Sequence, residues 1–193
     1  FEYNNILELE RIVQQNDLAA IKMEPIRNTQ PMNDFLQKVR ELASKNNIVL
    51  IFDECTTGFR QSFGGIHKIY GVEPDIAIFG KALGNGYAIS AIIGCESVMD
   101  AANDTFISST FWTERIGSVA ALKTLEIMER ERSWKRVTDL GNLMRAHWSQ
   151  LSKNNGLDIT LNGIPPLSSF VIEHPDALKF KTLITQEMLK KGY

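Results

Sequence analysis

The sequence contains few cysteines and no long apolar run. Cys55 and Cys95 are the only cysteines in 193 residues, which is too few for a disulfide framework. Each lies within an apolar run, so we expect reduced, buried thiols and a cytoplasmic location. No stretch approaches the roughly 18 apolar residues of a membrane span, and no N-terminal segment has the form of a signal peptide. These absences argue against a secreted disulfide-rich domain and against a membrane protein.

The chain also lacks an excess of charge of either sign. Lys and Arg number 21 and Asp and Glu number 23, which gives a formal net charge of −2. A balance of this kind predicts neither nucleic acid nor an anionic membrane as a partner. The 3 histidines are scattered and form no cluster with ligand spacing, so we expect no metal site. The chain begins at Phe1 and stops at Tyr193 without the character of a tail, which favours a piece of a longer protein.

The alternation of apolar patterns predicts an α/β fold. Short apolar runs, expected as strands, cover residues 19–23, 48–52, 75–79, 88–94 and 168–173. Helical spacing covers residues 5–15, 33–47, 114–130, 135–154 and 177–191, with Asn33 as the expected N-cap of the second helix. The run 48–52 is apolar on both faces, which is typical of a parallel sheet covered on both sides. We therefore predict a three-layer α/β/α large domain over residues 1–163, without its N-terminal part, and the start of a smaller α/β domain over residues 164–193.

Reactive side chains follow three of the expected strands. In open α/β sheets, ligands bind outside the carboxyl ends of the strands. Glu24 follows the first strand, Asp53 the second and Lys81 the third. A carboxylate at the tip of a buried strand is costly unless a cation meets it. Asp53 is thus either a structural cap or ion pair, or the partner of a protonated ligand nitrogen, and a metal is the less favoured ligand.

Lys81 lies in a glycine-rich segment, where the backbone is open to a ligand. A solvated lysine in a turn is the alternative, and the spacing of a phosphate-binding P-loop is absent. Lysine forms Schiff bases with pyridoxal phosphate, and this cofactor also needs an acid beside its pyridine nitrogen. Lys81 and Asp53 could supply that pair from neighbouring strand ends.

Three motifs together resemble the class III pyridoxal-phosphate aminotransferases of fold type I. They read IFDECTTGFR at 51–60, YGVEPD at 70–75 and FGKALGNG at 79–86. The sequence is most similar to the glutamate semialdehyde aminomutase branch, which shares the Thr-Gly-Phe-Arg and the Gly-Gly after it. The resemblance runs from about residue 19 to the end and implies pyridoxal phosphate as the cofactor. It implies that an amino group moves from an amino donor to a carbonyl acceptor through a Lys81 Schiff base and a pyridoxamine intermediate.

The resemblance also implies roles for individual residues. Lys81 would form the Schiff base and then carry the proton between substrate and cofactor, while Asp53 would pair with the pyridinium nitrogen. Cys55 stands where the family has an apolar residue packed on the cofactor ring, and Thr56 stands beside the ring hydroxyl. Glu24, within Met-Glu-Pro, would brace the site.

The segment at the start of the third expected helix carries the remaining implications. Thr110 matches a threonine that reaches the cofactor phosphate of a neighbouring subunit, so the resemblance implies a homodimer. Trp112 and Arg115 stand where the aminomutases have small residues, which resembles aminotransferases of surface-polysaccharide pathways. The family's phosphate-binding loop and ring-stacking aromatic would precede residue 1, so we expect the chain alone to be inactive. The alternative is a truncated binding or assembly fragment that no longer catalyses, and the presence of both Lys81 and Asp53 argues against it.

Overall fold

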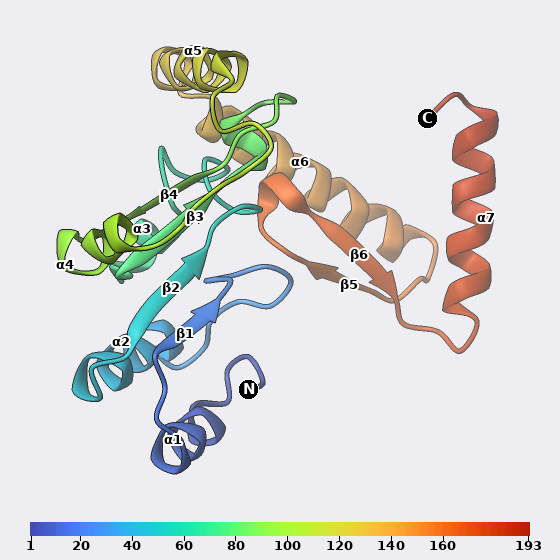
Figure 1. Cartoon of the computed structure of the whole chain (residues 1–193). Helices are drawn as coiled ribbons and strands as arrows, with labels where there is room; N and C mark the ends of the chain where they lie inside the picture. The colour runs from blue at the N-terminus through green and yellow to red at the C-terminus, as the bar shows by residue number, and fades with distance from the viewer. The chain divides into compact units, whose positions relative to one another are not determined.

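The computed structural model describes all 193 residues and contains two separate sheets. The chain divides into two compact units, Phe1–Val137 and Thr138–Tyr193. The first unit holds a four-stranded sheet in the order β1-β2-β3-β4, and the second holds the pair β5-β6 (Figure 1). The α/β class predicted from the sequence is confirmed. The predicted boundary between residues 163 and 164 concerns the domains of the complete protein and stays a prediction.

The sheet of the first unit is mixed. Its strands are β1 Ala20–Met23, β2 Val49–Asp53, β3 Ile76–Phe79 and β4 Ala91–Gly94. The first three are parallel, and β4 runs antiparallel to β3. Because the carboxyl ends of parallel strands meet at one edge, Asp53 at the end of β2 lies at the same edge of the sheet as Glu24 and Lys81, which follow β1 and β3.

Long helices pack on one face of this sheet, which we call the covered face. Its residues are Ile21, Met23, Leu50, Phe52, Ala77 and Phe79. The helices that bury it are α1 Ile6–Gln15, α2 Phe35–Lys45 and α5 Arg115–Glu131. Leu50 and Phe52 are completely buried there. The covered face therefore holds the hydrophobic core of the first unit.

The opposite face, which we call the open face, carries no core. Its residues are Lys22, Val49, Ile51, Asp53, Ile76 and Ile78, all of them half-buried or exposed. Neither buried cluster draws on these residues, although the short helix α4 Glu96–Met99 reaches the edge of the face at Gly94. The apolar run 48–52 is thus covered on one side in this chain, rather than on both as expected.

The predicted helices and strands lie close to their expected ranges, and the structure adds several short elements. The other elements are α3 His67–Tyr70, α6 Ser133–Asn154, β5 Ile159–Asn162, β6 Ser169–Ile172, α7 Ala177–Lys190 and the 3-10 helices η1 Lys81–Leu83, η2 Asp100–Asp104 and η3 Pro165–Leu167. Strand β5 was not predicted, and it pairs antiparallel with β6. The predicted N-cap Asn33 is wrong, because the chain enters α2 through Asn33 and Asp34 in left-handed conformations and neither side chain caps the helix. Cys95 is exposed and only Cys55 is half-buried, so the expectation of two buried thiols is wrong for Cys95.

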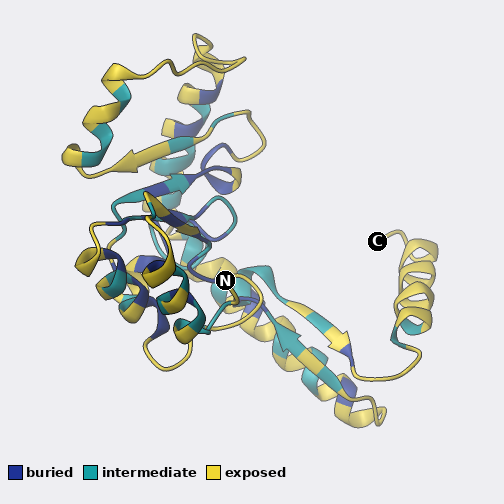
Figure 2. Cartoon of the chain, turned by 60° about the horizontal axis from the view of Figure 1, so that its bottom comes forward, coloured by how far each residue is buried: buried dark blue, intermediate teal, exposed yellow.

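Burial differs between the elements. In Figure 2 buried residues gather around the first sheet, whereas α7 has no buried residue at all. In the second unit, Trp148 packs on Phe170 with ring centroids 5.1 Å apart.

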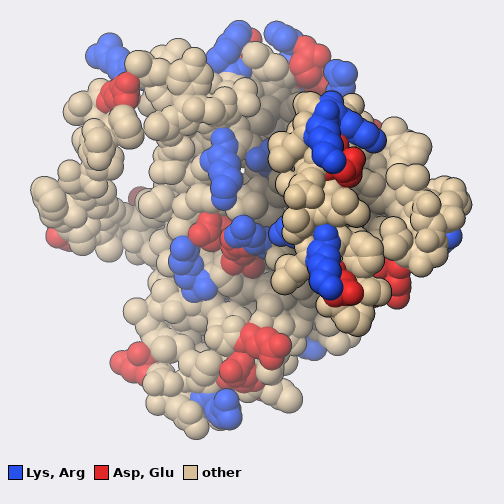
Figure 3. All heavy atoms as spheres, turned by 90° about the vertical axis from the view of Figure 1, so that its right-hand side faces the viewer, with Lys and Arg blue, Asp and Glu red and all other residues tan.

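On the face shown in Figure 3, basic and acidic side chains lie beside one another, in keeping with the near-neutral net charge. None of the helices is both long and apolar enough to cross a membrane.

Candidate active site

Lys81 opens the 3-10 helix that follows β3. Its backbone has a φ of 40°, a left-handed conformation that costs a non-glycine residue on the order of 1 kcal/mol. Its amino group donates a 2.7 Å hydrogen bond to Oγ1 of Thr56 and forms no ion pair with a carboxylate. An exposed amine held only by a neutral hydroxyl is available to react with a carbonyl compound.

Asp53 ends β2 on the open face. Its Oδ1 accepts a 3.1 Å hydrogen bond from the backbone N–H of Cys55, and its Oδ2 lies 3.0 Å from Nζ of Lys22. Partial burial pushes the pKa of this carboxyl up, but the hydrogen bonds from Lys22 and Cys55 outweigh burial and hold the pKa below its ordinary value. Asp53 is therefore a charged carboxylate at neutral pH, and its side chain keeps 24% of its surface exposed.

Cys55 lies among the charged groups of the site. Burial and the hydrogen bond with Asp53 raise the pKa of its thiol, while Lys81 and Lys22 act in the opposite direction. A Cβ on Gly80 would lie 3.3 Å from the Cys55 sulfur, which is tighter than ordinary contact. Glycine at position 80 thus leaves room beside the thiol, at the turn that leads into Lys81.

Five of the six predicted site residues gather at one edge of the sheet. Thr56 and Cys55 follow Asp53, and Lys81 reaches Thr56. Glu24 follows β1 at the same edge, where its Oε1 lies 2.8 Å from Nη1 of Arg27. The sixth, Thr110, lies exposed in a turn at residues 110–113 and forms no hydrogen bond with the other five. The role implied for Thr110 involves a second subunit and stays a prediction.

Two features of the site were missed from the sequence, and the first is Lys22. It lies in a run that was interpreted only as an apolar strand, yet the register of β1 against β2 places it on the open face with Asp53. Strand alternation was the available signal, because Lys22 interrupts the apolar residues on the outward side of β1.

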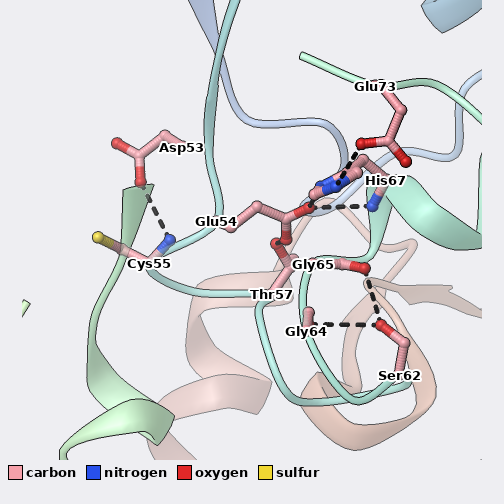
Figure 4. A network of polar contacts seen from close by, with 9 residues as sticks. All are labelled: Asp53, Glu54, Cys55, Thr57, Ser62, Gly64, Gly65, His67 and Glu73. Carbon is pink, nitrogen blue, oxygen red and sulfur yellow. Dashed lines mark hydrogen bonds and ion pairs between the residues drawn. The ribbon is translucent and has the colours of Figure 1, made fainter. Parts of the chain in front are cut away.

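The second missed feature is a buried network behind the site. Glu54 is completely buried, and its Oε1 accepts hydrogen bonds of 2.9 Å from both the backbone N–H and Nδ1 of His67. Its Oε2 accepts a 2.7 Å bond from the hydroxyl of Thr57. Figure 4 shows Asp53 and Cys55 on one side of the strand end and the Glu54 network on the other. His67 thus anchors Glu54, the residue after Asp53.

The network leaves no spare room. A Cβ on Gly65 would lie 2.2 Å from the His67 ring, so glycine is required for the loop to pass over the imidazole. On the outer side, Nε2 of His67 lies 3.7 Å from the exposed carboxylate of Glu73. The turn that carries Cys55 and Thr56 is therefore fixed from behind.

The residues present fit pyridoxal phosphate. Lys81 supplies an amine without a carboxylate partner, Asp53 supplies an ionised carboxylate with exposed surface, and Gly80 opens the backbone between them. These are the groups that a Schiff-base lysine and a pyridinium partner require. In contrast, a separate hollow of the first unit is lined by Phe59, Tyr87 and residues of α5 and includes neither Lys81 nor Asp53.

Comparison with known proteins agrees with this geometry. Residues 2–192 match the family described as Aminotransferase class-III. The chain is 38% identical over 195 residues to 3-aminobutyryl-CoA aminotransferase of Cloacimonas acidaminovorans, covering 96% of this chain and 47% of that protein. It is 30% identical over 203 residues to glutamate-1-semialdehyde 2,1-aminomutase of Methanococcoides burtonii, covering 99% and 47%. The chain thus spans about half the length of the curated relatives it matches.

Solved structures give the same result. The PLP internal aldimine form of the FumI protein of Sphingopyxis sp. MTA144 superposes with a TM-score of 0.86 at 25% identity, covering 92% of this chain and 44% of that one. Acetylornithine aminotransferase of Elizabethkingia anophelis superposes with a TM-score of 0.80 at 30% identity, covering 90% and 45%. The fold type I assignment is confirmed, and the chain belongs to the class III aminotransferases, a family whose cofactor is pyridoxal phosphate.

Proposed function

We propose that the complete protein is a pyridoxal-phosphate-dependent aminotransferase or aminomutase that moves an amino group between an amino donor and a carbonyl acceptor. The observation that carries the proposal is the pairing of a reactive amine, Lys81, with an ionised carboxylate, Asp53, at neighbouring strand ends. The retention of both groups also disfavours the alternative of a non-catalytic assembly fragment.

Bound pyridoxal phosphate supplies an electron sink for a substrate carbanion. Asp53 would accept a hydrogen bond from the protonated ring nitrogen, because the lowered pKa of its carboxyl keeps the group ionised at neutral pH. Nζ of Lys81 would hold the cofactor, and the same amine would accept and return the proton at the reacting carbon. The Thr56 hydroxyl orients Nζ, and the Glu54 network fixes the turn that presents Thr56.

The proposed enzyme is a homodimer in which Thr110 approaches the cofactor phosphate of the neighbouring subunit. Large apolar side chains around Thr110 are exposed, which supports a protein contact at this segment. They are Phe106, Ile107, Phe111, Trp112, Ile116, Val119 and Leu122. Sedimentation of the complete protein should give a dimer, and a monomer at micromolar concentration would contradict this part of the proposal.

For the acceptor, we propose a carbonyl compound of a surface-polysaccharide pathway. The support is the departure of Trp112 and Arg115 from the small residues of the aminomutases. The names of the similar proteins indicate different substrates, so the acceptor has to be tested directly. Carbonyl sugars should be consumed faster than glutamate semialdehyde when each is supplied to the complete protein that carries the amino form of the cofactor.

The central experiment is reduction of the complete protein with borohydride in the presence of pyridoxal phosphate, followed by peptide mapping. We expect the pyridoxyl group on the peptide containing Lys81. Lys22 is an internal control, because it is a second amine near Asp53 but is held by that carboxylate. A label on Lys22 or on any other lysine would refute the assignment of Lys81.

A further inference from the structure

A second cation occupies the site beside the proposed cofactor partner. Nζ of Lys22 lies 3.0 Å from Oδ2 of Asp53, and both side chains project from the open face. The two residues come from adjacent parallel strands, so the contact is set by the register of the sheet and not by a mobile loop. Lys22 remains 58% exposed, so its ammonium keeps much of its hydration.

Asp53 has the capacity to bind two cations at once. Each carboxylate oxygen offers two acceptor sites. The N–H of Cys55 uses a site on Oδ1, Lys22 uses one on Oδ2 and the Cys55 thiol uses a third, which leaves one acceptor site on the carboxylate. A protonated ring nitrogen can therefore bind Asp53 while Lys22 stays in place.

The other charged groups near Asp53 do not duplicate Lys22. Lys81 donates to the Thr56 hydroxyl, and burial raises the pKa of the Cys55 thiol and so favours its neutral form. Glu24 at the end of β1 pairs with Arg27. Lys22 is therefore the cation that shares the Asp53 carboxylate.

On the basis of the proposed function, we propose that Lys22 is a tuning residue that shares Asp53 with the ring nitrogen of the cofactor and makes that nitrogen less basic. Asp53 attracts the ring proton, and the positive charge of Lys22 offsets part of that attraction. The consequence is a weaker electron sink than Asp53 alone would give. Lys22 acts through Asp53 and is a positioning residue that does not itself contact the reacting atoms.

The expected size follows from the contact of Lys22 with Asp53 and from the exposure of Lys22. A neighbouring charge shifts a pKa by about 1–3 units, and solvent together with the intervening carboxylate reduces the effect of Lys22 on the ring nitrogen. We therefore expect removal of the Lys22 charge to raise the proton affinity of the ring nitrogen by about tenfold, which is about one pKa unit.

The test uses the complete protein loaded with pyridoxal phosphate that carries nitrogen-15 in the ring. The nitrogen chemical shift is followed against pH for the parent, Lys22→Met and Lys22→Arg. We expect the ring pKa to rise by about one unit in Lys22→Met and to stay at the parent value in Lys22→Arg, which keeps the charge. The pH dependence of the nitrogen shift reports the pKa of the ring nitrogen directly. A merely structural role of Lys22 would leave this pKa unchanged.

An equal ring pKa in all three proteins would overturn the proposal. If circular dichroism shows that Lys22→Met folds poorly, Lys22→Gln is used in its place. The outcome is separable from that of the proposed function, because borohydride labelling of Lys81 in the parent is measured first. Labelled Lys81 with an unchanged ring pKa refutes the tuning role alone, whereas absence of the label refutes the proposed function.

Discussion

The two faces of the four-stranded sheet differ in what they do, although they alternate along the same strands. On β2, Leu50 and Phe52 face the helices and are completely buried, whereas Ile51 and Asp53 face the open side and are half-buried. The hydrophobic stabilisation of the first unit thus lies on one face, and the charges of the site lie on the other. Neighbouring residues of β2 therefore belong alternately to the hydrophobic core and to the face that carries the candidate site.

The same contrast recurs at the end of β2, where two carboxylates follow each other. Asp53 is partly exposed and meets one ammonium, while Glu54 is fully buried and accepts three hydrogen bonds. The exposed surface of Asp53 leaves room for a further hydrogen-bond partner, whereas both oxygens of Glu54 already accept hydrogen bonds from Thr57 and His67. Of the two acids, the structure favours Asp53 for ligand binding and Glu54 for holding the turn.

The largest expected effect compares the two faces directly. Phe52→Ala should lower the free energy of unfolding of the complete protein by about 3–5 kcal/mol, because it empties a fully buried site. Ile51→Ala, the matched control on the open face, should cost about half as much or less, since its side chain already contacts solvent. Urea unfolding followed by circular dichroism measures both. Equal losses would mean that the open face is packed in the complete protein as tightly as the covered face.

A slightly smaller effect is expected from the buried carboxylate. Glu54→Leu strands the Thr57 hydroxyl and both donors of His67, so stability should fall by about 3 kcal/mol. Glu73→Leu is the control, because this exposed acid lies 3.7 Å from the other side of the same imidazole and should change stability by less than about 1 kcal/mol. Thermal and urea midpoints of the two variants give the comparison. A tolerated Glu54→Leu would show that the network is dispensable.

The contrast between the faces also explains what the sequence could predict. The parallel strands and the placement of Asp53 and Lys81 at one edge of the sheet were predictable, because apolar runs mark strands and the carboxyl ends of parallel strands share an edge. The partnership of Lys22 with Asp53 depends on the pairing of β1 with β2, and that of Glu54 with His67 on how the intervening loop folds back. Local sequence contains neither pairing.

The other differences between prediction and structure each have an identifiable cause. Asn33 has the chemistry of an N-cap, but its left-handed backbone points the chain away from capping geometry. The antiparallel direction of β4 and the short strand β5 depend on partners that lie elsewhere in the chain. Thr110 has no partner among the site residues of this chain, so its predicted role depends on a second subunit.

On the open face, Asp53→Asn sharpens the distinction between chemistry and stability. Asparagine cannot carry the charge that keeps the ring nitrogen protonated, so removal of the substrate proton should slow by about 10²-fold, about 2.7 kcal/mol in activation free energy. The cofactor should remain bound, because Lys81 is unchanged. Stopped-flow half-reactions measure the rate, and visible absorbance measures the bound cofactor. An unchanged rate would assign Asp53 a structural role only.

The smallest expected effect is a change in the acid sensitivity of the cofactor-free complete protein. The pKa of Asp53 lies below its ordinary value of 3.8, since Lys22 and the Cys55 N–H outweigh the effect of burial. A carboxyl whose pKa is lower in the folded state than in the unfolded state stabilises the fold at a pH above the unfolded-state pKa. This stabilisation is lost as the pH falls through the folded-state pKa. Lys22→Met should therefore narrow the difference between the urea midpoints at about pH 6 and about pH 3. Lys68→Met, which removes an exposed lysine without an ion pair, should leave that difference as it is. If both variants behave alike, the Lys22–Asp53 contact contributes nothing to folding, and any role of Lys22 is confined to the bound cofactor.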